Sequence, residues 1–124
     1  MPPSAIKQTD TAPRAKERNR FIKLRGQIQV TRKIFSRLLS VSERLLADIE
    51  TDKTAPTEPV LRKLREMERL TIELRKTIDP DFIGAWLSEP NNAFDGSTPV
   101  QVIERGEIDR IWQMIYFVRS GTPT

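Results

Sequence analysis

Apolar side chains recur at intervals of three and four residues in several short segments of this chain, and that spacing constrains it to a helical fold. The sequence has 124 residues, only five of them Gly, and this length suits one ordinary domain or two very small ones. Residues three and four apart share one face of a helix, so each segment has an apolar side that must be buried. The sequence therefore predicts an all-α fold.

The front of the chain is expected to begin with a polar tail and a first helix. Residues 1–13 contain three Pro and no apolar rhythm, so we expect disorder there. Phe21, Leu24 and Ile28 then lie at helical spacing, which predicts a helix over 14–28 whose last turn is weakened by Gly26.

Two short helices follow, with a break of about three residues at 40–42. Thr31 can cap the first and Ser42 the second, because a hydroxyl oxygen accepts from a free N–H of the first turn. Such a pair is typical of a helix-turn-helix. After a polar connection at 51–57, apolar spacing predicts a long helix over 59–78.

The rear of the chain alternates short apolar segments with turn signals. Residues 82–87 have helical spacing, and 90–92 interrupt it. Thr98 and Pro99 are typical of a helix start, which predicts a short helix through residue 103. The last helix is expected over 107–119, with Gly121 near its end.

The net charge of +4 is unevenly distributed. Residues 1–78 carry 18 Lys and Arg against 10 Asp and Glu, whereas residues 79–124 carry 3 against 7. A basic half attracts phosphate backbones, and an acidic, apolar half suits a protein partner. Ordinary solvated helix faces would give the same counts, so charge alone leaves both interpretations open.

The helix-turn-helix pattern yields candidate DNA-binding residues, because its second helix lies in the major groove while the first crosses the backbone. Four candidates for phosphates are Thr31, Arg32, Lys33 and Arg37. The exposed side of the second helix is expected to carry Ser42, Glu43, Arg44, Ala47 and Asp48. Arg44 is the best candidate for a guanine or a phosphate. The two acids are unfavourable near phosphates, so a scaffold with weak DNA binding stays open as the alternative.

The last helix has more apolar surface than one core stripe needs. Its predicted core stripe consists of Ile108, Ile111, Trp112, Ile115 and Val118. Met114, Tyr116 and Phe117 lie off that stripe. Exposed apolar or aromatic patches usually mark an interface, so this helix is expected to bind protein.

Two segments resemble known families. Residues 29–70 resemble the Xre/Cro repressors, with a departure at Ser40, where Gly is usual at the turn. Residues 83–121 resemble the Xre/MbcA/ParS toxin-binding domain. The matching features, in order, are Trp86-Leu87, Pro90-Asn91, Phe94-Asp95-Gly96, Thr98-Pro99, Gly106-Glu107 and Gly121. Phe94 replaces a more usual Leu, and Asp95 a usual small residue.

These resemblances imply an antitoxin of a type II toxin-antitoxin system. A helix-turn-helix DNA-binding-like domain over 14–78 would be joined by its long helix to a toxin-binding domain over 79–124. The rear domain would form a homodimer, hold a RES-domain toxin that consumes NAD or uses it to modify targets, and block its active site. The front domain would bind operator DNA and repress the operon. Residues implied in toxin binding or dimerisation are Trp86, Asn91, Phe94, Trp112, Met114, Ile115, Tyr116, Phe117, Arg119, Ser120 and Gly121.

The residue types exclude several other functions. The chain has no Cys and no His, so thiol nucleophiles, imidazole bases and Cys/His zinc sites are ruled out. Its acids assemble into no site with a base or phosphate-binding loop, so we expect no enzyme, catalytic residue, cofactor or metal. No segment is apolar enough to cross a membrane, and we expect a cytoplasmic protein. Two rivals stay open: a free-standing transcriptional regulator that dimerises through its tail, and a protein-binding module that no longer contacts DNA.

Overall fold

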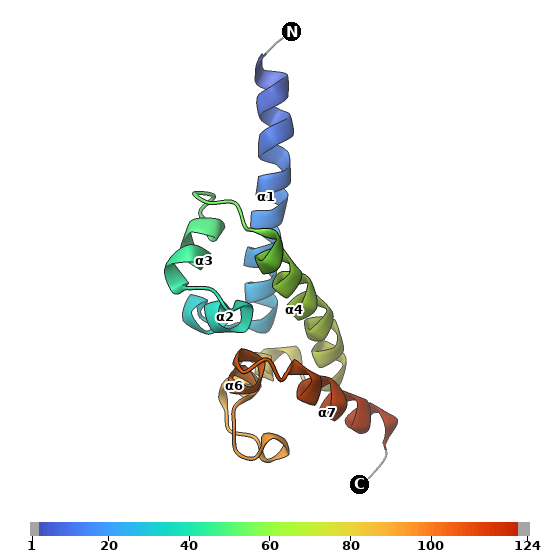
Figure 1. The fold of residues 1–124 in the computed structure, drawn as a ribbon. Helices are drawn as coiled ribbons and strands as arrows, with labels where there is room; N and C mark the ends of the chain where they lie inside the picture. Colours follow the sequence, from blue (N-terminus) through green and yellow to red (C-terminus); the bar gives the residue numbers. More distant parts are fainter. Residues whose placement is uncertain (1–2, 122–124) are drawn as a thin grey trace.

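The structure, a computed structural model, describes residues 3–121 and is built of helices joined by short turns (Figure 1). The helices are α1 (Pro3–Ile28), α2 (Arg32–Leu39), α3 (Glu43–Glu50), α4 (Glu58–Thr77), α5 (Ile83–Ser88), α6 (Pro99–Glu104) and α7 (Ile108–Ser120). Two 3-10 turns, η1 (Pro80–Phe82) and η2 (Asn92–Phe94), flank α5. Residues 3–121 contain no strand, which confirms the predicted all-α class.

Helix α1 is longer than the sequence predicted. It begins at Pro3, so residues 3–13 are helical where disorder was expected; residues 1 and 2 lie outside the described part, and side chains are described from Ala15 on. Pro13 lies inside this helix, where Pro removes a backbone hydrogen bond, and the Pro content of residues 1–13 is the reason why disorder was predicted. The other end falls at Ile28 as predicted, where Gln29 follows with a φ of 53°.

Capping residues set the starts of three helices as predicted. The Thr31 hydroxyl accepts from the Ile34 N–H at 3.2 Å, and the Ser42 hydroxyl accepts from the Leu45 N–H at 3.0 Å. Each cap satisfies one backbone donor that the first turn leaves free. Thr98 caps α6 within a capping box, with Pro99 in the first turn.

The turn between α2 and α3 has left-handed backbone at a residue that is not Gly. Ser40 ends α2 with a φ of 57°, and its N–H donates to the Arg37 carbonyl at 3.3 Å. Left-handed backbone favours Gly because a Cβ crowds the following carbonyl. Ser40 therefore stands at a position whose backbone conformation favours Gly.

The core runs without interruption from the front of the chain to the rear. Buried apolar residues of α1 to α4 and those of α5 to α7 form one cluster. Helix α6 packs on α2, and α7 packs on α4, so the long helix serves both halves (Figure 1). The predicted boundary at residues 78 and 79 coincides with the end of α4, but the core continues across it.

Gly84 allows α5 to pack closely against the end of α1. A Cβ at this position would lie 2.7 Å from the Gln29 carbonyl oxygen and 2.9 Å from that of Ile28. Real Cβ atoms do not approach backbone oxygens so closely, so only Gly lets α5 meet the end of α1 here.

Candidate protein interface and DNA-binding face

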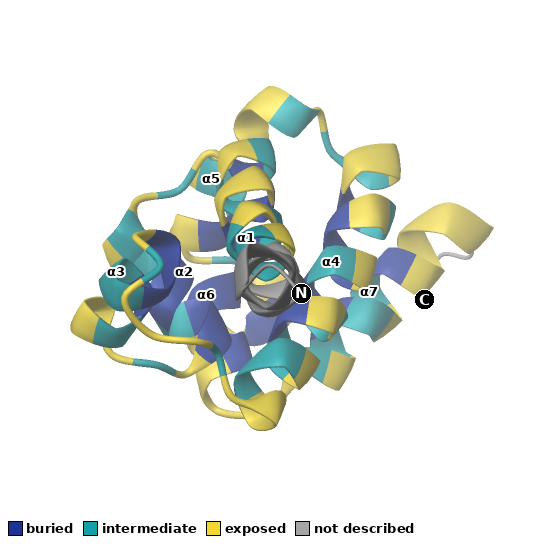
Figure 2. Cartoon of the chain, turned by 90° about the horizontal axis from the view of Figure 1, so that it is seen from above, coloured by how far each residue is buried: buried dark blue, intermediate teal, exposed yellow. Residues whose placement is uncertain are grey.

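The last turns of α7 carry an exposed apolar patch. Tyr116 is 73% exposed, Phe117 46% and Val118 59%, whereas Ile111 and Ile115 are buried against the core. Figure 2 shows this end of the helix exposed at the edge of the molecule. The predicted exposure of Tyr116 and Phe117 is confirmed. The prediction of Val118 as core is wrong, because burial along α7 ends at Ile115 and Val118 lies in the exposed turn that follows.

A groove between α4 and the end of α7 adjoins this patch. It is lined by Glu73, Trp112, Ile115, Tyr116, Arg119 and Ser120. Arg119 forms an ion pair with Glu73 across the groove, and Lys76 donates to the same carboxylate at 3.3 Å. The hydrogen bond from Lys76 is the main cause that holds the pKa of Glu73 below its usual range, and Arg119 adds to it. The predicted interface residue Arg119 is thus held on its own protein's surface.

Ser120 and Gly121 both stabilise the end of α7. The Ser120 hydroxyl donates to the Phe117 carbonyl at 3.1 Å. Gly121 has a φ of 66° and ends α7 in the left-handed conformation that helix ends favour. Both lie beside the exposed patch and stay candidates for contact with a partner.

Several predicted toxin-binding residues instead build the loop between α5 and α6. Phe94 is only 1% exposed, packs edge-on against Trp86 with 6.4 Å between ring centroids, and lies beneath the Arg110 guanidinium. Asn91 accepts from the Ala93 N–H at 2.9 Å and so caps η2. Phe94 and Ile115 were predicted as partner contacts, and their burial corrects this: both are core residues that shape the surface from below.

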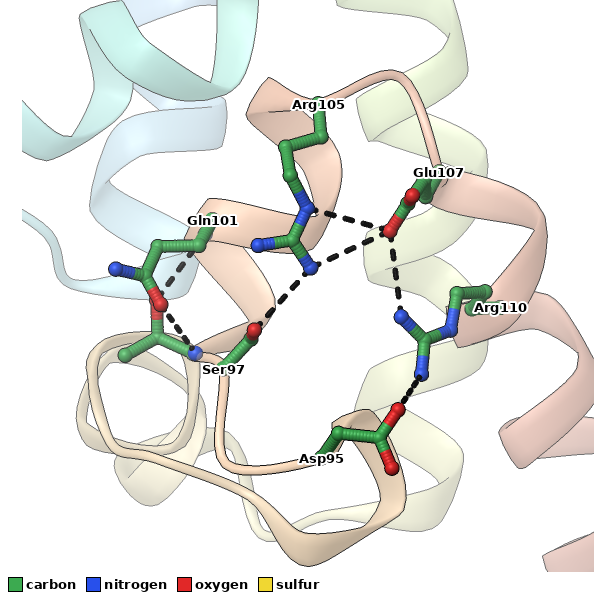
Figure 3. A network of polar contacts seen from close by, with 7 residues as sticks. Asp95, Ser97, Gln101, Arg105, Glu107 and Arg110 are labelled. Carbon is green, nitrogen blue, oxygen red and sulfur yellow. Dashed lines mark hydrogen bonds and ion pairs between the residues drawn. The ribbon is translucent and has the colours of Figure 1, made fainter.

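A polar network that the sequence did not reveal fixes this loop to the start of α7 (Figure 3). Arg110 donates to Asp95 at 3.1 Å and to Glu107 at 3.3 Å. Arg105 donates to Glu107 at 3.3 Å and to Ser97 at 3.2 Å. Asp95 has a φ of 57°, and its short polar side chain tolerates that conformation. The sequence indicated a turn at Asp95–Gly96, but it did not indicate that Arg110, 15 residues away, pairs with Asp95.

Two of the cations predicted to contact phosphates are engaged within the protein. Arg32 donates to Glu50 at 2.9 Å, and Arg25 donates to the same carboxylate at 2.8 and 3.1 Å. Glu50 is 2% exposed, so these two guanidiniums neutralise a buried charge. Arg37 makes two hydrogen bonds to Glu104, at 2.9 and 2.7 Å, which join α2 to α6.

The exposed side of α3 has mixed charge. A shallow depression there is lined by Arg32, Glu43, Arg44, Ala47, Asp48 and Lys53. Arg44 is exposed, and no ion pair is recorded for it in the described part of the chain. Thr31 and Ser42 use their hydroxyls as caps, while Lys33 is exposed. The predicted face is therefore assembled, but of its four predicted cations only Lys33 and Arg44 form no ion pair with a side chain among residues 15–121.

Two other kinds of feature are absent from the residues that the structure describes. Among residues 15–121, whose side chains are described, no three acidic side chains lie close enough together to hold a metal ion. Among the same residues, no helix combines the length and apolar character needed to cross a bilayer.

The fold thus belongs to the class in which a helix-turn-helix pair and a long helix pack against a short helical tail. A chain in the crystal structure of the M. tuberculosis MbcT-MbcA toxin-antitoxin complex has this fold, with a TM-score of 0.70 over 86% of this chain and 96% of that chain. The two sequences are 17% identical, so the similarity concerns the fold. No protein-family model matches the sequence, and no curated protein does.

Proposed function

We propose that this chain is an antitoxin that neutralises a toxin by binding it through the end of α7. The exposed apolar patch of Tyr116, Phe117 and Val118 carries this proposal. Aromatic side chains supply large contact area at low entropic cost, and they are enriched among the residues that dominate binding energy. The fold shared with a chain of a toxin-antitoxin complex supports the same role.

The proposed mechanism is steric and needs no catalytic group. A toxin, which we propose to be of the RES type, docks against the patch, and the end of α7 obstructs its active site. Half-buried Trp112 and Met114 extend the contact toward the core. The exposed ion pair of Arg119 with Glu73 contributes little by itself, so Arg119 can exchange Glu73 for a carboxylate of the toxin. The homodimer forms through the same surface of α7 or through the loop between α5 and α6.

Co-expression with the product of the neighbouring gene tests this role. We expect the two proteins to co-purify and toxicity to be relieved, and we expect Tyr116→Ser with Phe117→Ser to lower the affinity at least tenfold. Ile22→Ser is the matched control, because Ile22 is 44% exposed on α1 and far from the patch in sequence. A double variant that binds as tightly as the unaltered protein would exclude the patch. A double variant that melts as a whole would place these residues in the core.

We further propose that the chain binds operator DNA and represses its own operon, with Arg44 on α3 as the reading residue. The helix-turn-helix pair and its exposed Arg44 support this role. A free-standing regulator that dimerises through its tail is the rival interpretation. A specific operator in a genome with no toxin-like gene beside this one would favour that rival.

A further inference from the structure

A strongly basic groove lies between α1 and α4, away from the surfaces described above. Its lining residues are Arg20, Lys23, Leu24, Gln27, Arg62, Arg65, Glu68, Arg69 and Ile72. It shares no residue with the depression beside α3. In two perpendicular views, α3 and α4 lie on opposite sides of α1 (Figures 1 and 2), so the groove and the exposed side of α3 are separate surfaces.

The groove holds five cations against one carboxylate. That carboxylate, Glu68, accepts from Arg20 at 3.1 and 2.6 Å, and this pairing raises the pKa of Arg20. Arg65 pairs outside the groove with Glu58 at 2.7 Å. Lys23, Arg62 and Arg69 form no ion pair with any side chain among residues 15–121. Unneutralised cations facing one cleft concentrate a positive potential there.

The spacing of these cations suits a linear polyanion. Arg62, Arg65 and Arg69 lie on one face of α4 at i, i+3 and i+7, so their Cα atoms span about 10 Å along the helix. Arg20 and Lys23 face them from α1. Guanidinium groups form two parallel hydrogen bonds with phosphate oxygens. A row of such groups can therefore follow a chain of phosphates.

An acidic peptide fits this groove less well. Protein partners derive most of their affinity from apolar anchors in pockets, but here the apolar lining is limited to buried Leu24 and to Ile72. A nucleic-acid backbone, by contrast, gains its affinity for a protein from positive charge, because each phosphate neutralised by Lys or Arg releases counterions. We propose that the groove between α1 and α4 binds the phosphodiester backbone of nucleic acid, without reading its sequence. This site does not depend on the toxin-binding role.

Fluorescence anisotropy of the full chain with labelled duplex DNA of random sequence, over a salt series, tests the proposal. We expect Arg62→Gln with Arg69→Gln to weaken binding at low salt at least tenfold. Loss of two phosphate contacts should also reduce the slope of log affinity against log salt by about 1.8. Arg75→Gln with Lys76→Gln is the matched control, because it removes two cations from the same helix outside the groove. Its affinity should stay within twofold of the unaltered protein.

Four further measurements separate the possible explanations. Single-stranded RNA in place of the duplex shows which nucleic acid uses the groove, and binding of either supports the site. Arg44→Glu tests α3: if it abolishes binding while the groove variant binds normally, the groove proposal is overturned. It is equally overturned if neither nucleic acid binds at low salt, or if polyglutamate binds the groove as tightly as DNA. If the antitoxin proposal is correct, the groove variant should still co-purify with the toxin, whereas the nucleic-acid measurements do not depend on that proposal.

Discussion

Gly84 determines how closely the tail can approach the front of the protein. At this residue the backbone of α5 lies against the carbonyl oxygens that end α1. The contact cannot relax by a side-chain rotation, because the crowding atoms belong to backbone. A single methyl group would therefore separate two helices that the core requires to be in contact.

We predict that Gly84→Ala lowers the free energy of unfolding by about 1–3 kcal/mol, the range for overpacking a well-packed site. Urea unfolding followed by circular dichroism measures this. Gly26→Ala is the matched control, since Gly26 also lies in a helix but a Cβ there meets nothing within 4 Å. That substitution should stabilise the protein by about 0.5–1 kcal/mol because Ala loses less backbone entropy in a helix. Equal effects of the two substitutions would contradict the packing argument.

Sequence patterns predict local polar contacts better than distant ones. The caps by Thr31, Ser42 and Thr98 were predictable because donor and acceptor lie three residues apart. The pairing of Glu50 with Arg25 and Arg32 joins three helices, and nothing in the spacing of these residues indicates it. For this reason Arg32 was predicted as a phosphate contact rather than as the partner of a buried acid.

At the scale of elements, α7 shows what helical periodicity can and cannot predict. The stripe through Ile111 and Ile115 was correctly predicted to be core. Val118 continues that stripe by spacing alone, yet it is exposed, although its neighbour Arg119 still reaches Glu73 of α4. Periodicity identifies the face of a helix that can be buried, but it does not indicate at which residue burial ends.

The contact of α2 with α6 depends on an ion pair and therefore on pH. The hydrogen bond from Arg37 holds the pKa of Glu104 below its usual range. A carboxylate whose pKa is lowered by folding stabilises the folded state at any pH above the pKa that it has in the unfolded chain, about 4.3. This contribution is lost as the pH falls through the lower pKa of the folded state. We predict that Glu104→Gln costs about 0.5 kcal/mol at pH 7, a value kept small because both side chains are over a third exposed.

Urea unfolding of both proteins at pH 7 and pH 3 measures this contribution. The difference between the unaltered protein and Glu104→Gln should shrink toward zero at pH 3. Glu89→Gln serves as the control, because Glu89 is exposed and forms no ion pair with a side chain among residues 15–121. A difference for Glu104→Gln that is the same at both pH values would show that the carboxylate charge contributes nothing.

At the scale of the whole molecule, the continuous core predicts a single cooperative unfolding transition. Both tryptophans, Trp86 and Trp112, lie in the rear half, whereas the front half contains most of the helical residues. Tryptophan fluorescence therefore reports the rear, and far-ultraviolet circular dichroism reports mainly the front. We predict that the two signals share one midpoint in urea, because neither half can bury its apolar faces without the other. Separate midpoints would instead support two domains at 14–78 and 79–124.

The fold class and most helix boundaries followed from the sequence, but the relation of the two halves did not. Charge counts and family-like motifs divide the chain near residue 78. The packing of α6 on α2 and of α7 on α4 joins segments that are 30 residues or more apart along the chain. Periodicity marks which faces are apolar, but it does not indicate which apolar faces meet.

The shared core also links any partner of the tail to helices that the partner never touches. A ligand that binds only the folded state raises the free energy of unfolding by mass action. The increase is about 2.7 kcal/mol when the ligand concentration is one hundred times its Kd. Because α7 packs on α4 and α6 on α2, this added stability against unfolding extends to the front helices as well. A complex formed at the end of α7 would thus slow exchange of amide hydrogens and cleavage by proteases throughout the chain.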